Sequence, residues 1–424
     1  MFHEAACPVH IHSYKQERAG GFLFFQACKR KRKRTMSALW FRMIAVMLSI
    51  GTSAQVCGFG IITTNSRTAL FVSAALEEKQ VSQAPDLSAK AAVLMCADTG
   101  EVLFEKNADE KLAIASITKI MTAVIALEYA AANDREIRFT SAMTAEGSSL
   151  YLQEGDVMKL SELVKGMMSV SGNDAANAIA FGIAGSLDAF AELMNQKARQ
   201  LGMTNTHFVT PSGLDHENHY STAKDMAVLC CYAMRNREFA DIVSQKSLTV
   251  QFVTPENKQQ YCKNHNRLLS MYEGCIGIKT GFTKKAGRTL TSCAERNGVR
   301  LLAVTLNAPD DWNDHQRLYD HGFSCTTLFS AVSAEESYRL PVVGGEQNEV
   351  IVRPVCGCSL TVRNDADDQT NSPVKTSVLI PHSVDAPIEK GMVLGEIDVY
   401  YREKKISSVS LAAAEAIRIQ KEEC

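Results

Sequence analysis

The sequence Ser116-Ile-Thr-Lys-Ile-Met-Thr-Ala-Val-Ile-Ala-Leu-Glu-Tyr-Ala-Ala131 decides the fold of the central part of the chain. Its apolar residues recur at steps of three and four, which predicts a helix with one buried side. The serine lies three residues before a lysine, so the hydroxyl and the amine share one face of the helix. Lysine is a poor base in water, because its ordinary pKa is about 10.4. Burial and a second nearby cation would lower this pKa and let Lys119 take the proton of Ser116.

Two further short motifs follow, Ser171-Gly-Asn173 and Lys279-Thr-Gly281. In the first, the hydroxyl can relay a proton, and the carboxamide can hold the peptide group of a substrate together with the lysine. We predict the second at the end of a strand, where its cation and hydroxyl suit a substrate carboxylate. Its glycine would leave room for the substrate backbone. Each motif alone is common, but the three in this order predict an acyl-transfer site that uses lysine as the base.

The surrounding segments predict an α+β catalytic domain at 87–330, with helices packed on a mostly antiparallel sheet. The strands of this sheet come from both ends of the domain. The expected strands are 91–97, 101–104, 275–279, 289–294 and 299–306, and the expected helices are 116–131, 160–169, 175–183, 187–201, 222–234 and 314–329. Short valine- and isoleucine-rich runs between turn residues then predict a small β domain at 337–405. The tail at 406–424 is short, and peripheral contact with a membrane surface stays open for it.

The first 76 residues read as a leader, and 77–86 as a linker. The basic run Lys29-Arg-Lys-Arg-Lys-Arg34 precedes Met36 and an apolar stretch at 43–62, which together are typical of an export signal. Cleavage after Ala54 or Ala74 fits this interpretation. An uncleaved anchor is the alternative for the apolar stretch, and nuclear targeting or nucleic-acid binding is the alternative for the basic run. We expect no later segment to be long and apolar enough to span a bilayer, and we expect the catalytic part to lie outside the cytoplasm.

Composition narrows the classes of function. The chain has 424 residues, of which 46% are hydrophobic and 22% charged, as in globular proteins. The formal net charge of −2 gives no reason to expect a nucleic-acid partner. The 13 cysteines form no pair of C-x-x-C units, and the histidines are irregularly spaced, so we expect no metal site.

Beyond the three motifs, the chain resembles a known family, the penicillin-recognising serine acyltransferases. It is most similar to the low-molecular-mass penicillin-binding proteins that are D-alanyl-D-alanine carboxypeptidases, and the resemblance covers about 87–329. The β domain resembles the C-terminal domain of that family. The segments that carry the resemblance besides the motifs are 201–208, Pro211-Ser-Gly-Leu-Asp215, His219-Tyr-Ser-Thr222, Asn264-His-Asn-Arg267 and Ala386-Pro-Ile-Glu-Lys-Gly391.

The resemblance implies an enzyme that trims the last D-alanine from peptidoglycan stem peptides through an acyl-enzyme, without a cofactor, and that is inhibited by β-lactams. Phe282 stands where some relatives have histidine, which bears on the shape of the pocket. The roles that the resemblance implies are nucleophile for Ser116, general base for Lys119, proton shuttle for Ser171, substrate positioning for Asn173, carboxylate binding for Lys279 and Thr280 beside Gly281, and an oxyanion hole formed by the backbone N–H groups of Ser116 and Phe282.

Two alternatives remain open. A serine β-lactamase of the commonest class uses a glutamate four residues before an asparagine, and here Ala191-Glu-Leu-Met-Asn195 has alanine at that place. A non-catalytic β-lactam sensor or an inert wall-binding module is the other alternative. The usual sensor carries a multi-span membrane segment, which is not expected here, and an inert module would have lost one of the motifs.

Overall fold

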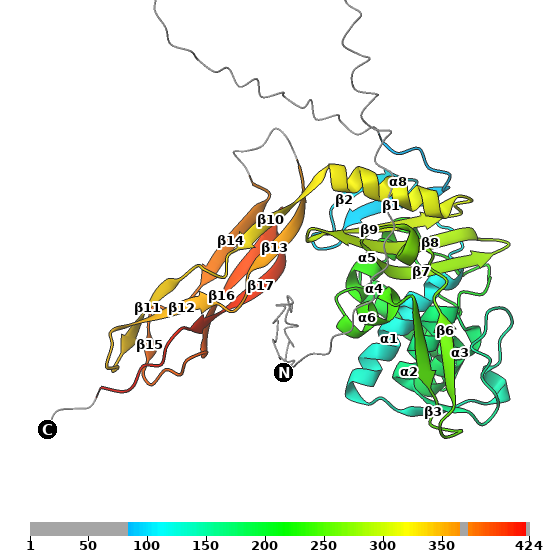
Figure 1. Cartoon of the computed structure of the whole chain (residues 1–424), viewed down its shortest axis with the longest axis horizontal. Helices are drawn as coiled ribbons and strands as arrows, with labels where there is room; N and C mark the ends of the chain where they lie inside the picture. Colours follow the sequence, from blue (N-terminus) through cyan, green and yellow to red (C-terminus); the bar gives the residue numbers. More distant parts are fainter. Residues whose placement is uncertain (1–83, 365–371, 421–424) are drawn as a thin grey trace, which may run out of the picture. The chain divides into compact units, whose positions relative to one another are not determined.

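A computed structural model describes residues 84–364 and 372–420 (Figure 1). The predicted leader at 1–76 and most of the predicted linker lie outside the described residues, as do the last four residues of the tail. All the described residues fall within one compact unit.

The catalytic part is built on a five-stranded sheet in the order β2-β1-β9-β8-β7, in which all neighbours are antiparallel. Its strands come from both ends of this part, which confirms the predicted α+β architecture. The strands just before the nucleophile motif and the strand that carries Lys279 therefore belong to one sheet. The bounds are β1 Ala91–Cys96, β2 Val102–Lys106, β7 Cys275–Thr283, β8 Gly287–Arg296 and β9 Val299–Leu306.

Helices cover both faces of this sheet, as Figure 1 shows for α5 and α8. Successive side chains of a strand point to opposite faces. In β1, alternate residues from Ala91 pack into the larger core, and the residues between them pack into a second core with α8. This explains why β1 is an uninterrupted apolar run. The helices are α1 Lys119–Ala132, α2 Leu160–Val170, α3 Asn173–Ala184, α4 Leu187–Gln200, α5 Ala223–Ala233, α6 Arg237–Ser244, α7 Leu268–Met271 and α8 Asp311–Ser324.

Helix α1 differs from its prediction in burial. Every residue from Lys119 to Leu127 is buried, rather than one side of the helix alone. We expected no later segment to be long and apolar enough to span a bilayer, and this expectation is wrong. The helical window Ala115–Ala132 is long and apolar enough, with a mean hydropathy of 1.3. Within the protein, 67% of this window is buried, so α1 is the central helix of the larger core.

Two other predictions also need correction. The expected helix at 314–329 ends at Ser324, and Thr326–Val332 forms strand β10 instead. Strand β10 pairs with β13, Cys358–Arg363. The two strands are distant along the chain, so local sequence patterns could not predict this pairing. The sequence prediction also missed α6, α7 and two small hairpins. These hairpins are formed by β3 Glu136–Arg138 with β4 Val157–Lys159, and by β5 Ser247–Gln251 with β6 Gln259–Lys263.

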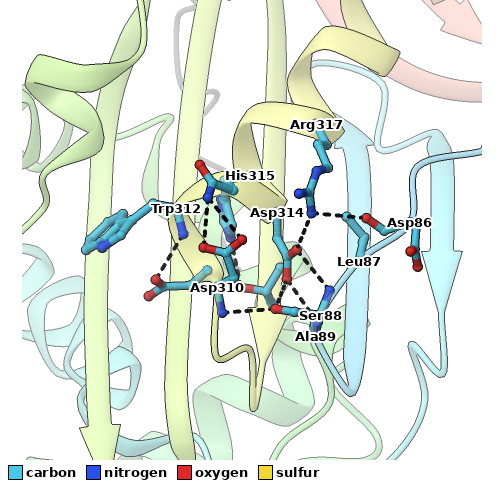
Figure 2. Close-up of polar contacts among 12 residues, drawn as sticks. Asp86, Leu87, Ser88, Ala89, Asp310, Trp312, Asp314, His315 and Arg317 are labelled. Carbon is cyan, nitrogen blue, oxygen red and sulfur yellow. Dashed lines mark hydrogen bonds and ion pairs between the residues drawn. The ribbon is translucent and has the colours of Figure 1, made fainter.

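A buried carboxylate fixes the point at which the described chain enters the sheet (Figure 2). Asp314, in the first turn of α8, accepts hydrogen bonds from Ser88 N at 2.9 Å, Ser88 Oγ at 2.7 Å and Ala89 N at 2.9 Å. Arg317 donates to Asp314 and to the carbonyl oxygen of Asp86. The segment before β1 is thus tied to α8, which fixes the start of the strand.

The C-terminal part is a small β domain with its own core, as predicted. Its main sheet has the order β14-β16-β17-β12-β11-β15, in which only the β11–β15 pair is parallel. The predicted boundary at 405/406 falls inside β17, and Ile417 still pairs with Ile388. The bounds are β11 Tyr338–Val343, β12 Glu349–Pro354, β14 Val374–Leu379, β15 Val384–Asp385, β16 Val393–Tyr401 and β17 Lys404–Ala413.

Candidate active site

Ser116 lies on a 3₁₀ turn, η1 (Ala115–Thr118), that leads directly into α1. The residue before it, Ala115, adopts the left-handed region with φ +49°, which turns the chain sharply at the serine. The amine Nζ of Lys119 lies 3.0 Å from Ser116 Oγ. Ser116 is partly exposed whereas Lys119 is fully buried, so the hydroxyl can meet a substrate while the amine stays out of water.

Lys119 has two further hydrogen-bond partners. Its Nζ lies 2.7 Å from Asn173 Oδ1 and 2.6 Å from the backbone carbonyl oxygen of Ser212. Both of these oxygens can only accept. A neutral amine has two N–H groups and one lone pair, so the two acceptors take both N–H groups and the lone pair faces Ser116 Oγ. This is the arrangement that a general base needs in order to remove the serine proton.

Electrostatics favour the neutral form of this amine. Burial lowers the pKa of Lys119 well below its ordinary value, and the charge of Lys279 lowers it further, while Asp174 acts in the opposite direction. Burial also lowers the pKa of Lys279 to about 7. Lys279 is therefore the second basic group whose charge lowers the pKa of Lys119, as the sequence analysis expected of a nearby cation.

The second motif lies between two helices that bring it to Lys119. Ser171 ends α2 in the left-handed region with φ +62°, and Asn173 begins α3. Asn173 Nδ2 donates to the carbonyl oxygen of Glu146 at 2.6 Å, which turns Oδ1 toward Lys119. Ser171 is also buried. Among the hydrogen bonds within 84–364 and 372–420, none joins its hydroxyl to Ser116 or Lys119, and its proton-shuttle role stays a prediction.

The third motif lies in the middle of β7 rather than at the end of a strand, because β7 continues to Thr283. Lys279 is buried and its Nζ donates to the carbonyl oxygen of Thr280 at 3.0 Å. A Cβ at Gly281 would lie 2.9 Å from Ser116 N. The same Cβ would lie 2.4 Å from Thr289 Oγ1, so the missing side chain lets β7 lie close to the nucleophile turn, and the room that we expected for a substrate backbone stays a prediction. Phe282 is 67% exposed, and its part in an oxyanion hole stays a prediction.

The sequence analysis gave no role to the segment that holds Ser212. This residue acts through its backbone carbonyl, so its side-chain type carries no signal. The glycine that follows is informative: Gly213 has φ +82°, and a Cβ there would lie 2.0 Å from the carbonyl oxygen of Ala115. The segment is pressed against the nucleophile turn, and only glycine fits that approach.

The asparagine of the β-lactamase lookalike has a structural contact. Asn195 lies on α4, where its Nδ2 donates to the carbonyl oxygen of Phe208 and its Oδ1 accepts from Phe208 N, both at 2.8 Å. Its amide thereby fixes the segment that leads toward Ser212. Ala191 is buried on the same helix, so no acid stands at the place where that class of enzyme needs one.

Comparison with known proteins gives consistent matches. A family model described as D-alanyl-D-alanine carboxypeptidase matches residues 78–310, and one described as penicillin-binding protein 5, C-terminal domain, matches 326–418. The chain is 33% identical to D-alanyl-D-alanine carboxypeptidase DacC of Escherichia coli, over 82% of this chain and 89% of that protein. It is 32% identical to D-alanyl-D-alanine carboxypeptidase DacF of Bacillus subtilis, over 78% and 86%.

A similar solved structure is that of penicillin-binding protein 5 from Haemophilus influenzae. Its sequence is 28% identical, the match covers 80% of this chain and 99% of that one, and the TM-score is 0.57. Both the helix-covered sheet and the β domain thus have counterparts in experimental structures.

Proposed function

The chain belongs to the D-alanyl-D-alanine carboxypeptidase family of serine peptidases, and from this premise we propose that it is exported and removes the terminal D-alanine from peptidoglycan stem peptides. We further propose that β-lactams inhibit it by acylating Ser116. The observation that carries the proposal is the position of Lys119 Nζ, which lies 3.0 Å from Ser116 Oγ and donates to two oxygens that can only accept.

The proposed acylation step begins at the base. Lys119 takes the proton of Ser116 Oγ, and the oxygen attacks the carbonyl carbon of the penultimate D-alanine. Backbone N–H groups of Ser116 and Phe282 stabilise the oxyanion. When the tetrahedral intermediate collapses, the peptide C–N bond breaks and the departing amine receives the proton through Ser171. Free D-alanine leaves, and the rest of the stem peptide stays as an ester on Ser116.

Hydrolysis uses the same base, with water in place of the serine hydroxyl. A water molecule gives a proton to Lys119 and attacks the ester carbon, and the serine oxygen recovers a proton as it leaves. Lys279 and Thr280 bind the terminal carboxylate of the substrate before acylation. A carboxylate beside a buried lysine favours the charged form, so substrate binding raises the pKa of Lys279 from about 7. Substrate binding thereby favours the positively charged form of Lys279, which binds the carboxylate.

The proposal predicts that the purified protein releases D-alanine from diacetyl-Lys-D-Ala-D-Ala. Diacetyl-Lys-D-Ala-L-Ala is the matched control, and we expect no release from it, because the carboxylate site fixes the position of the terminal residue. Chromatography of the free alanine that is released measures the product from both peptides. If benzylpenicillin labels the protein but D-alanine is not released, the β-lactam sensor is correct instead. If neither reaction occurs, the chain is an inert wall-binding module, and rapid turnover of benzylpenicillin without D-alanine release would identify a β-lactamase.

A further inference from the structure

His219 is a buried histidine, 4% exposed, that connects the nucleophile turn to the segment at 209–213. Its Nδ1 lies 3.1 Å from Val209 N and 3.3 Å from Thr210 N, and both of these groups donate to it. On the other side of the ring, Nε2 lies 2.8 Å from Thr118 Oγ1. Thr118 directly precedes Lys119, so the imidazole spans from the base to a neighbouring segment.

These contacts define the tautomer of the ring. Since Nδ1 accepts from two backbone N–H groups, it carries no proton. The neutral imidazole therefore has its proton on Nε2, which donates to Thr118 Oγ1. Burial is the main cause that lowers the pKa of His219 to about 4. The ring thus stays neutral at physiological pH and keeps both contacts.

The segment that the ring holds is the one that carries the Ser212 carbonyl. Gly213 N donates to Thr210 Oγ1 at 3.0 Å, which closes a tight turn around Ser212. Thr122 Oγ1 donates to the carbonyl oxygen of Pro211 at 2.6 Å. His219 fixes the entry to this turn, while the contact from α1 fixes its middle. The Ser212 carbonyl oxygen then lies 2.6 Å from Lys119 Nζ.

We propose that His219 is a positioning residue for the general base. By bridging Thr118 to the backbone of Val209 and Thr210, it holds the Ser212 carbonyl against Lys119 and so directs the lone pair of the amine at Ser116. This inference rests on the proposed function. His219 does not touch the reacting atoms, but the acylation step depends on it. If the bridge is lost, an N–H group of Lys119 loses its fixed acceptor and the amine can rotate away from the serine.

The test separates this role from a general effect on folding. Thr118→Val has nearly the shape of threonine but cannot accept the proton on Nε2, whereas Thr118→Ser keeps the hydroxyl. The loss of one buried hydrogen bond that holds the base corresponds to roughly a 5- to 150-fold change in rate. We expect the acylation rate constant at saturating benzylpenicillin to fall within that range for Thr118→Val. The apparent dissociation constant should change less than about twofold, and Thr118→Ser should restore most of the rate.

Nitrogen-15 NMR of the histidine side chains provides the second readout, with His219→Gln used for assignment. The proton should be found on Nε2 in the unmodified protein, and the Nε2 signal should move in Thr118→Val. An unchanged acylation rate in Thr118→Val, a proton on Nδ1, or a loss that merely follows a lowered melting temperature would overturn the inference. If the unmodified protein itself is not acylated, the proposed function fails and this inference fails with it. Normal acylation of both proteins refutes this inference alone.

Discussion

Replacing Ser116 with alanine will abolish both D-alanine release and covalent labelling by benzylpenicillin. Removal of the nucleophile of a serine peptidase lowers kcat by about 10⁴-fold or more, because the remaining groups cannot form the acyl-enzyme. The fold should survive, since Ser116 is partly exposed and its hydroxyl has Lys119 as its partner. The measurements are D-alanine release, intact mass after incubation with benzylpenicillin, and the melting temperature.

Ser141→Ala is the matched control for this experiment. Ser141 is exposed and begins a short 3₁₀ turn, and it carries no role in the proposed chemistry. Its variant should release D-alanine at the rate of the unmodified protein. Label that persists in Ser116→Ala would show that another residue is the nucleophile, and the assignment of the site would be wrong.

Replacing Lys119 with methionine will slow acylation by about 10²- to 10⁴-fold, which is the usual contribution of a general base. Methionine is unbranched and apolar, so it can fill the buried space of the lysine. It leaves Asn173 Oδ1 and the Ser212 carbonyl oxygen without their donor, and we expect some loss of stability as well. The rate constant at saturating benzylpenicillin, rather than the binding constant, should carry the effect.

Lys224→Met is the control for this variant. Lys224 is partly exposed and its ion pair with Asp109, at 3.8 Å, is a surface pair of small energetic value. Its variant should acylate at the normal rate. If Lys119→Met acylates within about threefold of the unmodified protein, the amine is not the base and Ser116 must be activated by another group.

The local parts of the site could be predicted from the sequence. The apolar spacing after Ser116 predicts the helix, and the helix places the hydroxyl and the amine on one face. The short runs of strand residues on either side of turn residues predict much of the sheet, including β8 and β9. These features depend on neighbours within a few residues, and local patterns record them well.

The remaining parts depend on partners that are distant in sequence. The Ser212 carbonyl reaches Lys119 because a glycine 98 residues beyond Ala115 allows two backbones to touch. Gly281 also lies against the nucleophile turn, since a Cβ there would lie 2.9 Å from Ser116 N. The end of α8 was misplaced because β10 takes its stability from pairing with β13. A single sequence has no local signal for such contacts.

The pH dependence of acylation tests the central claim most directly, that Lys119 is neutral in the free enzyme. A base works only when unprotonated, so its contribution is present above its pKa and lost as the pH falls through it. Because burial and Lys279 lower the pKa of Lys119, the second-order rate constant of acylation, which reports on the free enzyme, should reach its plateau well below the ordinary lysine value of 10.5. A rate that keeps rising about tenfold per pH unit up to that value would show an ordinary, protonated lysine and contradict the account.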